Sequence, residues 1–249
     1  SLIDNLDSIE DYDLIILSCP LGAYKEVLSI IVPQIKSSCI ITDVGSTKIS
    51  VLNDFKKFED NKYLDFVPGH PVAGLEKSGP EYGFEELFNN RYCILTPKNK
   101  ESKGFLLIKK MWENLGMIVE TMDAKHHDRI LAMTSHIPQL IAYSIVATST
   151  ELEGHMKEEV IKYSAAGFRD FTRLAGSDPI MWRDIYLLNK DAVLEMLGRF
   201  SEDLSVLQKA IRNNDKNLLE KIFRATKEIR KEIENFGQAG TFDPREKDI

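Results

Sequence analysis

The chain has 249 residues, of which 43% are hydrophobic and 29% are charged, and its formal net charge is -7 at pH 7. This composition is typical of a soluble protein with one large domain or two smaller ones. The acidic balance argues against nucleic acid or an anionic membrane as the main partner.

The cysteines and the apolar runs indicate a cytoplasmic protein. Cys19, Cys39 and Cys93 are scattered and odd in number, which fits free thiols in a reducing cytosol better than a disulfide framework or a metal knuckle. No apolar run approaches the length of a membrane span, and no signal-peptide pattern is found. The chain begins Ser-Leu-Ile-Asp, without methionine, which we interpret as a trimmed start.

The first half of the sequence alternates short apolar runs with helical patterns. The runs predict strands at 13–18, 39–44, 63–67, 91–96 and 117–122. Helices are predicted over 24–35, shortened by Pro33, and over 49–58 and 102–115. Strands that alternate with helices predict a doubly wound α/β sheet over residues 1–122.

After Asp123 the strand signal stops. The pattern predicts a helix over 124–150 with a kink at Pro138. It predicts a second helix to about residue 212, with Asp178 as its N-cap and Pro179 in its first turn, and a third from Asp215 to Gly237. Residues 123–249 should therefore form an all-helical domain. Its apolar stripes favour a homodimer over a compact monomeric bundle, because one copy cannot bury them.

Three segments follow predicted strands, where the ligands of α/β sheets bind. They are Ser18-Cys19-Pro20, Asp43-Val44-Gly45-Ser46-Thr47-Lys48 and Gly69-His70-Pro71. Prolines and glycines restrain His70, and a restrained histidine is a natural general base; the alternative is a histidine in a surface turn. Gly45 would let the backbone approach a ligand, and the Ser46 hydroxyl can donate and accept, although Gly-Ser is also common in turns.

The glycine spacing typical of dinucleotide folds is missing. None of the 14 glycines forms a Gly-x-Gly-x-x-Gly pattern, which normally follows the first strand. Either the sheet binds no dinucleotide, or the first strand-helix-strand unit lies upstream of Ser1. We favour the second explanation, since the chain opens almost directly on a fully buried strand.

Two sets of side chains in the helical half are candidate binding sites. Arg169 and Arg173 are four residues apart and would share a helix face. Arginine binds carboxylates in a bidentate manner, but both could instead be solvated or paired with Asp170 and Asp184. No metal site is predicted around Asp123, His126, His127 and His136, because adjacent histidines point apart and no His-x3-His pair exists.

Together these segments resemble the prephenate dehydrogenase family, which includes arogenate and cyclohexadienyl dehydrogenases. The matching segments follow the family's order over nearly the whole chain: DLIILSCP, ITDVGSTK, GHPVAGLEKSG, ELFNNRYCILTP, MDAKHHDRILAMTSHIPQLIAY and GFRDFTRLAGSDPIMWRDI. The resemblance implies a dinucleotide domain, a helical dimerisation domain and an active site between them.

The resemblance also implies a reaction, the oxidative decarboxylation of prephenate or arogenate with NAD or NADP in tyrosine biosynthesis. Hydride leaves C4 of the cyclohexadiene ring for the nicotinamide, a base takes the hydroxyl proton, and loss of the ring carboxylate as CO2 aromatises the ring. His70 matches the family's catalytic histidine, and Ser46 matches the serine that orients it and touches the nicotinamide. Arg173 matches the arginine that binds a substrate carboxylate, with Arg169 in support.

The same resemblance assigns further residues. Glu76 matches a glutamate near the entrance, and His136 and Trp182 match residues that line or support the pocket. Gln139 stands where many members have a second histidine, and an amide cannot carry charge, so the preference for prephenate or arogenate stays open. The expected cofactor-binding residues are at the strand ends: Ser18, Cys19, Pro20, Gly45 and Ser46.

Two other functions remain as alternatives. Without the phosphate-binding turn, the chain could be a catalytically impaired fragment that acts only as a helical dimer with a broken cofactor domain. It could also be a dehydrogenase of 3-hydroxy acids, but the catalytic lysine that such enzymes carry on their helical domain is not found in the sequence.

Overall fold

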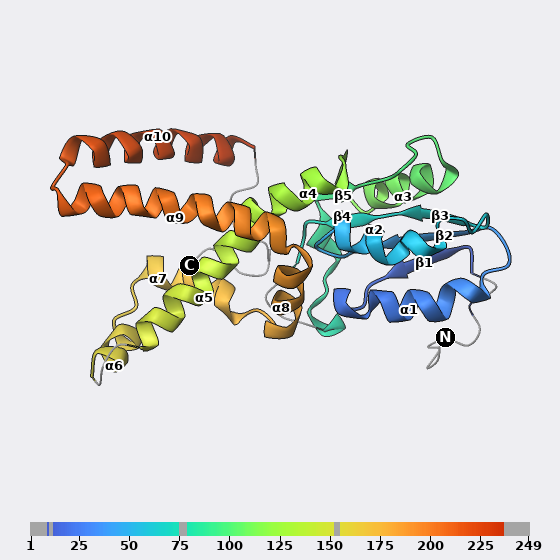
Figure 1. Ribbon diagram of the computed structural model, residues 1–249, viewed down its shortest axis with the longest axis horizontal. Helices are drawn as coiled ribbons and strands as arrows, with labels where there is room; N and C mark the ends of the chain where they lie inside the picture. The colour runs from blue at the N-terminus through green and yellow to red at the C-terminus, as the bar shows by residue number, and fades with distance from the viewer. Residues whose placement is uncertain (1–8, 10–11, 75–78, 152–154, 237–249) are drawn as a thin grey trace. The chain divides into compact units, whose positions relative to one another are not determined.

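A computed structural model describes residues 9, 12–74, 79–151 and 155–236 of the chain (Figure 1). The chain divides into two compact units, Ser1–Val193 and Leu194–Ile249. Glu76, the residue expected near the entrance of the site, lies outside the described residues.

The first sheet is parallel, as predicted. It contains β1 (Leu14–Leu17), β2 (Cys39–Asp43) and β3 (Leu64–Val67), in that order. Helices α1 (Tyr24–Ile31) and α2 (Ile49–Phe55) connect these strands, and each ends in a short 3-10 turn. Pro33 lies in the turn that ends α1, which confirms that it shortens this helix. The core under this sheet is made of Leu17, Tyr24, Leu28, Ile31, Ile41 and Val51.

The second sheet contains one strand that the sequence pattern missed. Its order is β4 (Gly69–Pro71), β5 (Tyr92–Leu95) and β6 (Ile118–Thr121), with β4 antiparallel to β5 and β5 parallel to β6. The helix between β5 and β6 is α3 (Lys103–Asn114), and the Ser102 side chain caps it. All five predicted strands are therefore confirmed, and a sixth strand joins them.

His70 lies in this short strand and is buried, so the alternative of a histidine in a surface turn is wrong. Pro68 has no N–H for the ladder of the first sheet, so the chain leaves that sheet after β3. His70 then pairs with Ile94 in the second sheet. Gly69 passes so close to β2 that an added Cβ would lie 3.0 Å from the carbonyl oxygen of Asp43. A three-residue strand is too short to give an alternating pattern.

The helical part begins with α4 (Ala124–Leu131), a π-helical segment (Ala132–His136) and α5 (Ile137–Thr150). The predicted kink takes the form of this π segment, which ends just before Pro138, where the helix lacks one N–H donor. Next come α6 (His155–Lys162), α7 (Ala166–Thr172) and a 3-10 turn, Arg173–Gly176.

The helix expected from Pro179 to about residue 212 is in fact two helices, α8 (Pro179–Leu188) and α9 (Lys190–Arg212). The break is at Asn189, whose backbone leaves the helical region at φ -111° and ψ 30°. Its buried side-chain amide donates to the carbonyl oxygen of Asp128 at 2.8 Å. This contact holds Asn189 in its non-helical conformation. The Asp178 side chain caps α8 as predicted, and Asp215 caps α10 (Lys216–Asn235).

One continuous helical run, Ala124–Thr150, is long and apolar enough to cross a membrane by length and composition, which corrects the expectation that no apolar run approaches this length. A core helix of a soluble protein passes the same test. Here the run carries His127, Asp128 and Gln139, all buried and all hydrogen-bonded to other segments of the chain. These contacts attach the run to the rest of the chain at three points.

The role of Asn189 can be tested by Asn189→Ala. We expect the free energy of unfolding to fall by about 1–3 kcal/mol, because the imidazole of buried His136 and the carbonyl of Asp128 lose a partner. Asn53→Ala, at an exposed site on α2, is the control and should change it by less than about 0.5 kcal/mol. Urea unfolding measures both, and equal values for the two variants would contradict this role.

Candidate active site

The three predicted ligand segments leave the first sheet at one edge. Leu17 pairs with Asp43, and Thr42 pairs with Val67. Because the strands are parallel, the residues that follow them emerge side by side. The structure therefore brings Ser18, Gly45-Ser46 and the approach to His70 to the same edge of the sheet.

A buried ion pair joins two of these segments. Lys48 Nζ lies 2.5 Å from Asp43 Oδ2, and both side chains are fully buried. The same ammonium donates to the carbonyl oxygen of Gly69, and the Asp43 carboxylate accepts from the backbone N–H groups of Gly45 and Gly69. One pair of charges thus fixes the backbone beside Ser46 and beside His70. Burial lowers the pKa of Lys48, and the carboxylate of Asp43 opposes that shift.

Gly45 also packs closely against other side chains of the protein, which the sequence did not indicate. An added Cβ would lie 2.5 Å from the Leu21 side chain and 2.9 Å from Asp43 Oδ2. Its N–H donates to Asp43 at 2.9 Å. Glycine is needed here for close packing inside the protein, and its amide is already engaged.

His70 forms a chain of hydrogen bonds with two residues of α4. Its Nδ1 lies 2.9 Å from His127 Nε2, and His127 Nδ1 lies 2.7 Å from Asp128 Oδ1. Asp128 also accepts from the backbone N–H groups of Lys48 and Ile49, at 2.7 and 2.9 Å. The Nε2 atom of His70 makes no hydrogen bond with any described residue, so it is the atom available to a ligand.

Burial lowers the pKa of His70 well below its ordinary value, and the nearby His127, Lys48 and His136 act in the same direction. The pKa of His127 is also lowered by burial, against the effect of Asp128. Both imidazoles are therefore neutral at pH 7, and a neutral imidazole can accept a proton.

A second set of buried side chains surrounds His136, at the end of the π segment. Its Nδ1 lies 3.2 Å from the Asn189 amide, and its ring meets that of Trp182 edge-on at 6.0 Å between centroids. Within the described residues, neither His136 Nε2 nor Trp182 Nε1 has a hydrogen-bond partner. These two nitrogens are the polar atoms that a ligand in this region could satisfy.

Gln139 lies one turn after His136 on α5 and is buried. Its amide donates to the carbonyl oxygen of Leu174 at 2.6 Å, which holds the segment that carries Arg173 against α5. The Arg173 N–H donates to the Arg169 carbonyl oxygen, so the two arginines follow one another by a helical turn, as predicted. Both arginine side chains are exposed, and Asp184, one of the possible partners, pairs with Arg183 instead.

The structure gives Ser46 no hydrogen bond to His70 among the described residues; the imidazole partner is His127. The sequence analysis assigned no role to Asp128 or Asn189. It considered His127 only as a metal ligand, and it named Asp43 and Lys48 only as the ends of a segment that follows a strand. One signal was available for His127, since it lies four residues before Leu131 on an amphipathic helix and so shares its buried face.

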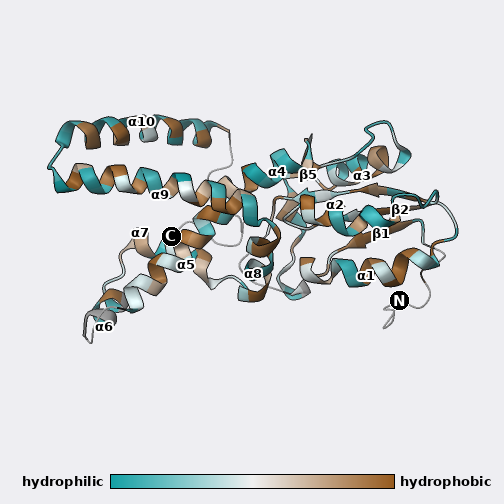
Figure 2. Cartoon of the chain, in the orientation of Figure 1, coloured by the Kyte–Doolittle hydropathy of each residue, from teal (hydrophilic) through white to brown (hydrophobic). Residues whose placement is uncertain are grey.

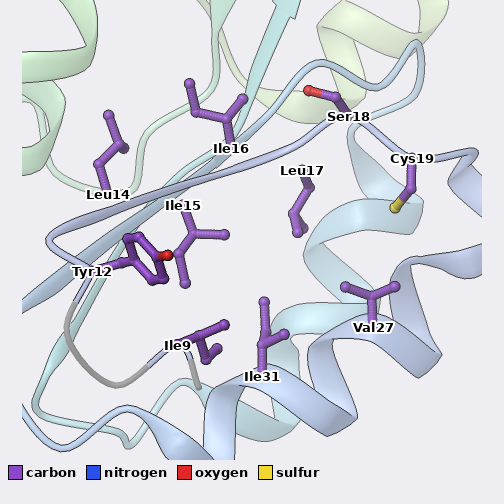
Figure 3. Close-up of a pocket in the computed structure, with 10 residues that line it drawn as sticks. All are labelled: Ile9, Tyr12, Leu14, Ile15, Ile16, Leu17, Ser18, Cys19, Val27 and Ile31. Carbon is purple, nitrogen blue, oxygen red and sulfur yellow. The ribbon is translucent and has the colours of Figure 1, made fainter. Parts of the chain in front are cut away.

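An apolar pocket of about 510 Å³ lies along β1 and α1 (Figure 3). Figure 3 shows the Ser18 hydroxyl and the Cys19 thiol on its wall, among the apolar side chains of both elements. Pro20, the third expected cofactor residue, does not line it. No group of three or more potential metal ligands occurs among the described residues.

A parallel sheet with a buried histidine near its ligand edge, followed by helices, is typical of nucleotide-dependent dehydrogenases with a helical second domain. Two family models match in succession: "Prephenate dehydrogenase, nucleotide-binding domain" over residues 2–121 and "Prephenate dehydrogenase, dimerization domain" over residues 123–225. The chain belongs to the prephenate dehydrogenase family, as its motifs indicated.

Individual relatives agree with this assignment. A cyclohexadienyl dehydrogenase of Zymomonas mobilis is 37% identical over 91% of this chain and 77% of its own length. A prephenate dehydrogenase of Lactococcus lactis is 31% identical over 94% of the chain, which spans 64% of that protein. The crystal structure of prephenate dehydrogenase from A. aeolicus with hydroxyphenyl propionate and NAD+ has a TM-score of 0.84 and 35% identity, covering 93% of this chain and 80% of that one.

The ion pair predicts a large effect of Lys48→Met. This variant leaves the Asp43 carboxylate buried without its cation, so the free energy of unfolding should fall by about 3–5 kcal/mol. The double variant Asp43→Asn/Lys48→Met should be less destabilised than Lys48→Met alone. Lys109→Met, which breaks an exposed pair with Glu113 at 3.7 Å, is the control and should cost less than about 1 kcal/mol. A Lys48→Met variant as stable as this control would contradict the assignment.

The buried histidines predict a loss of stability in mild acid. Burial lowers the pKa of His136 to about 4, whereas an unfolded histidine has a pKa of about 6.5. Between these two values the unfolded state binds more protons than the folded state. The free energy of unfolding therefore decreases as the pH is lowered, and this residue alone should reduce it by up to about 3 kcal/mol at pH 4. His136→Gln should flatten that dependence, as measured by denaturant unfolding at several pH values. An unchanged slope would contradict the shifted pKa.

Proposed function

We propose that the protein catalyses the oxidative decarboxylation of prephenate to 4-hydroxyphenylpyruvate, or of arogenate to tyrosine, with hydride transfer to NAD or NADP, in tyrosine biosynthesis. The observation that carries this proposal is the buried His70, whose Nδ1 contacts His127 Nε2 and whose Nε2 has no hydrogen-bond partner among the described residues. Support comes from the relative named cyclohexadienyl dehydrogenase and from the related A. aeolicus enzyme, which holds hydroxyphenyl propionate and NAD+.

In this reaction His70 acts as the general base. Its Nε2 takes the proton of the C4 hydroxyl while the C4–O bond gains double-bond character. It returns that proton to the oxygen as the ring carboxylate leaves as CO2 and the phenol forms. Burial favours the neutral imidazole at pH 7, so the base is ready without prior deprotonation.

A nicotinamide dinucleotide supplies the hydride acceptor when it is bound. The three strand ends that meet at one edge fit such a group, since this is where α/β sheets bind nucleotides. Ser18, Cys19, Pro20, Gly45 and Ser46 remain the proposed binding residues. Ser46 and Ser18 offer hydroxyl groups, whereas Gly45, with its N–H donated to Asp43, contributes only a close approach of the backbone.

The proposed substrate-binding residues are those of the helical part. Arg173, with Arg169 in support, is proposed to bind a substrate carboxylate, and Gln139 holds the Leu174 carbonyl next to Arg173. His136 and Trp182 offer unpartnered ring nitrogens beside the same helices. Glu76 and Ser46 stay in the proposal on the family resemblance alone.

We also propose that the protein is a cytoplasmic homodimer with a domain boundary near residue 122. The matched segments end at 121 and begin at 123, and the second is described as a dimerization domain. Figure 2 shows hydrophobic residues recurring along α9 and α10. Leu204, Val206, Ile211, Phe223 and Ile229 are among the exposed ones, and a second copy would cover them. The three cysteines are free, which suits the cytoplasm.

The proposal is tested by mixing the purified protein with prephenate or arogenate and with NAD or NADP, and following reduced dinucleotide by its absorbance at 340 nm. We expect turnover with at least one combination. His70→Asn should lower kcat by about 100-fold or more, because the general base is lost, while KM changes little.

The control is His126→Asn, an exposed position on α4 that is outside the site, which should leave kcat unchanged. Absence of turnover with all four combinations would reject the function. Turnover of His70→Asn at the rate of the unmodified protein would reject the role of His70 alone.

A further inference from the structure

Three side chains from two elements form a relay behind the proposed base. His70 comes from β4, and His127 and Asp128 come from α4. The relay runs from His70 Nδ1 to His127 Nε2 at 2.9 Å and from His127 Nδ1 to Asp128 Oδ1 at 2.7 Å. His127 is fully buried, and Asp128 is 1% exposed, so water does not compete for these hydrogen bonds.

The hydrogens in this relay can be assigned from its far end. Both oxygens of Asp128 accept backbone N–H groups, from Lys48 and Ile49, as expected of an ionised carboxylate. The neighbouring His127 Nδ1 must therefore be the donor. A neutral imidazole carries one N–H, so His127 Nε2 is an acceptor, and His70 must present Nδ1–H to it. The lone pair of His70 is then on Nε2.

We propose that His127 and Asp128 are positioning residues that fix His70 as its Nδ1–H tautomer and balance the charge that His70 acquires as a base. A histidine base can use only its unprotonated nitrogen, so a fixed tautomer keeps Nε2 competent in every molecule. The same logic orients the histidine of a Ser-His-Asp triad, here with a second imidazole between base and carboxylate.

The titratable groups around His70 explain why such a carboxylate is needed. His127 and His136 from α4 and the π segment and Lys48 from the loop after β2 all disfavour a positive His70. Asp43, the ion-pair partner of Lys48, and Asp128, at the end of the relay, are the negative groups of the network. Protonation of His70 polarises the relay toward Asp128, so the carboxylate stabilises the imidazolium without touching it.

The relay also connects two parts of the site. Because Asp128 accepts the N–H groups of Lys48 and Ile49, it holds the start of α2 and the loop that carries Ser46. A displacement of α4 would therefore move the hydrogen-bond partner of His70 and this loop together.

The tautomer can be measured on the protein itself, without turnover. The sequence has five histidines, so a long-range proton–nitrogen NMR spectrum of protein labelled with 15N in its imidazole rings can be assigned by single substitutions. At pH 8 we expect His70 to show a protonated Nδ1 and an unprotonated Nε2, and His127 to show the same pattern. A His70 protonated on Nε2 in the unmodified protein would overturn the proposal.

Matched variants test the kinetic role, which rests on the proposed function. His127→Phe removes the acceptor, so His70 should lose its fixed tautomer and kcat should fall by about 10–100-fold, with little change in KM. His127→Gln keeps an acceptor near the position of Nε2. It should retain the Nδ1–H tautomer and stay within about 10-fold of the original kcat.

His126→Phe, on the neighbouring exposed position, is the control and should change neither the NMR pattern nor kcat. An unchanged tautomer, kcat and pH profile in His127→Phe would overturn the proposal. If the protein turns over none of the substrates, the NMR pattern still decides the tautomer, so failure of the function and failure of the relay give different results.

Discussion

The geometry of the site depends first on the buried pair of Asp43 and Lys48. Both side chains are fully buried. Lys48 also donates a hydrogen bond to the backbone of Gly69, and Asp43 accepts hydrogen bonds from the backbone of Gly45 and Gly69. A buried charge is tolerated only where its partners are complete. The pair therefore restricts Gly45 and Gly69 to one arrangement, and these are the residues immediately before Ser46 and His70.

A second carboxylate, Asp128, extends this constraint into the helical part. It accepts the backbone N–H groups of Lys48 and Ile49, at the start of α2, and one side-chain N–H from His127. Two acidic groups, one at the end of β2 and one on α4, thus fix the backbone before His70 and the imidazole that contacts it. His70 lies on a short strand. Hydrogen bonds, and not apolar packing alone, fix both Gly69 before it and His127, which contacts its ring.

Sequence patterns were sufficient where a residue's role is local. The apolar runs predicted five of six strands, and Asp178, Asp215 and Pro33 marked the helix boundaries through capping and a missing N–H. They were insufficient where distant residues decide the conformation. Asn189 breaks a predicted helix through a contact with Asp128, 61 residues away. His70 pairs in β4 because Pro68 ends one ladder and β5 offers another. The relay was missed for the same reason, since 57 residues separate its two histidines.

The two irregularities of the helical part are physically connected. In an uninterrupted α-helix, residues nine positions apart point about 180° away from each other, so His127 and His136 would face opposite sides. The π segment between them, Ala132–His136, has more residues per turn and reduces this angle. Both histidines are then buried and both act on the pKa of His70. The break at Asn189 allows its amide to reach His136 as well as Asp128. Local departures from the regular helix therefore turn one amphipathic segment into a wall of the site.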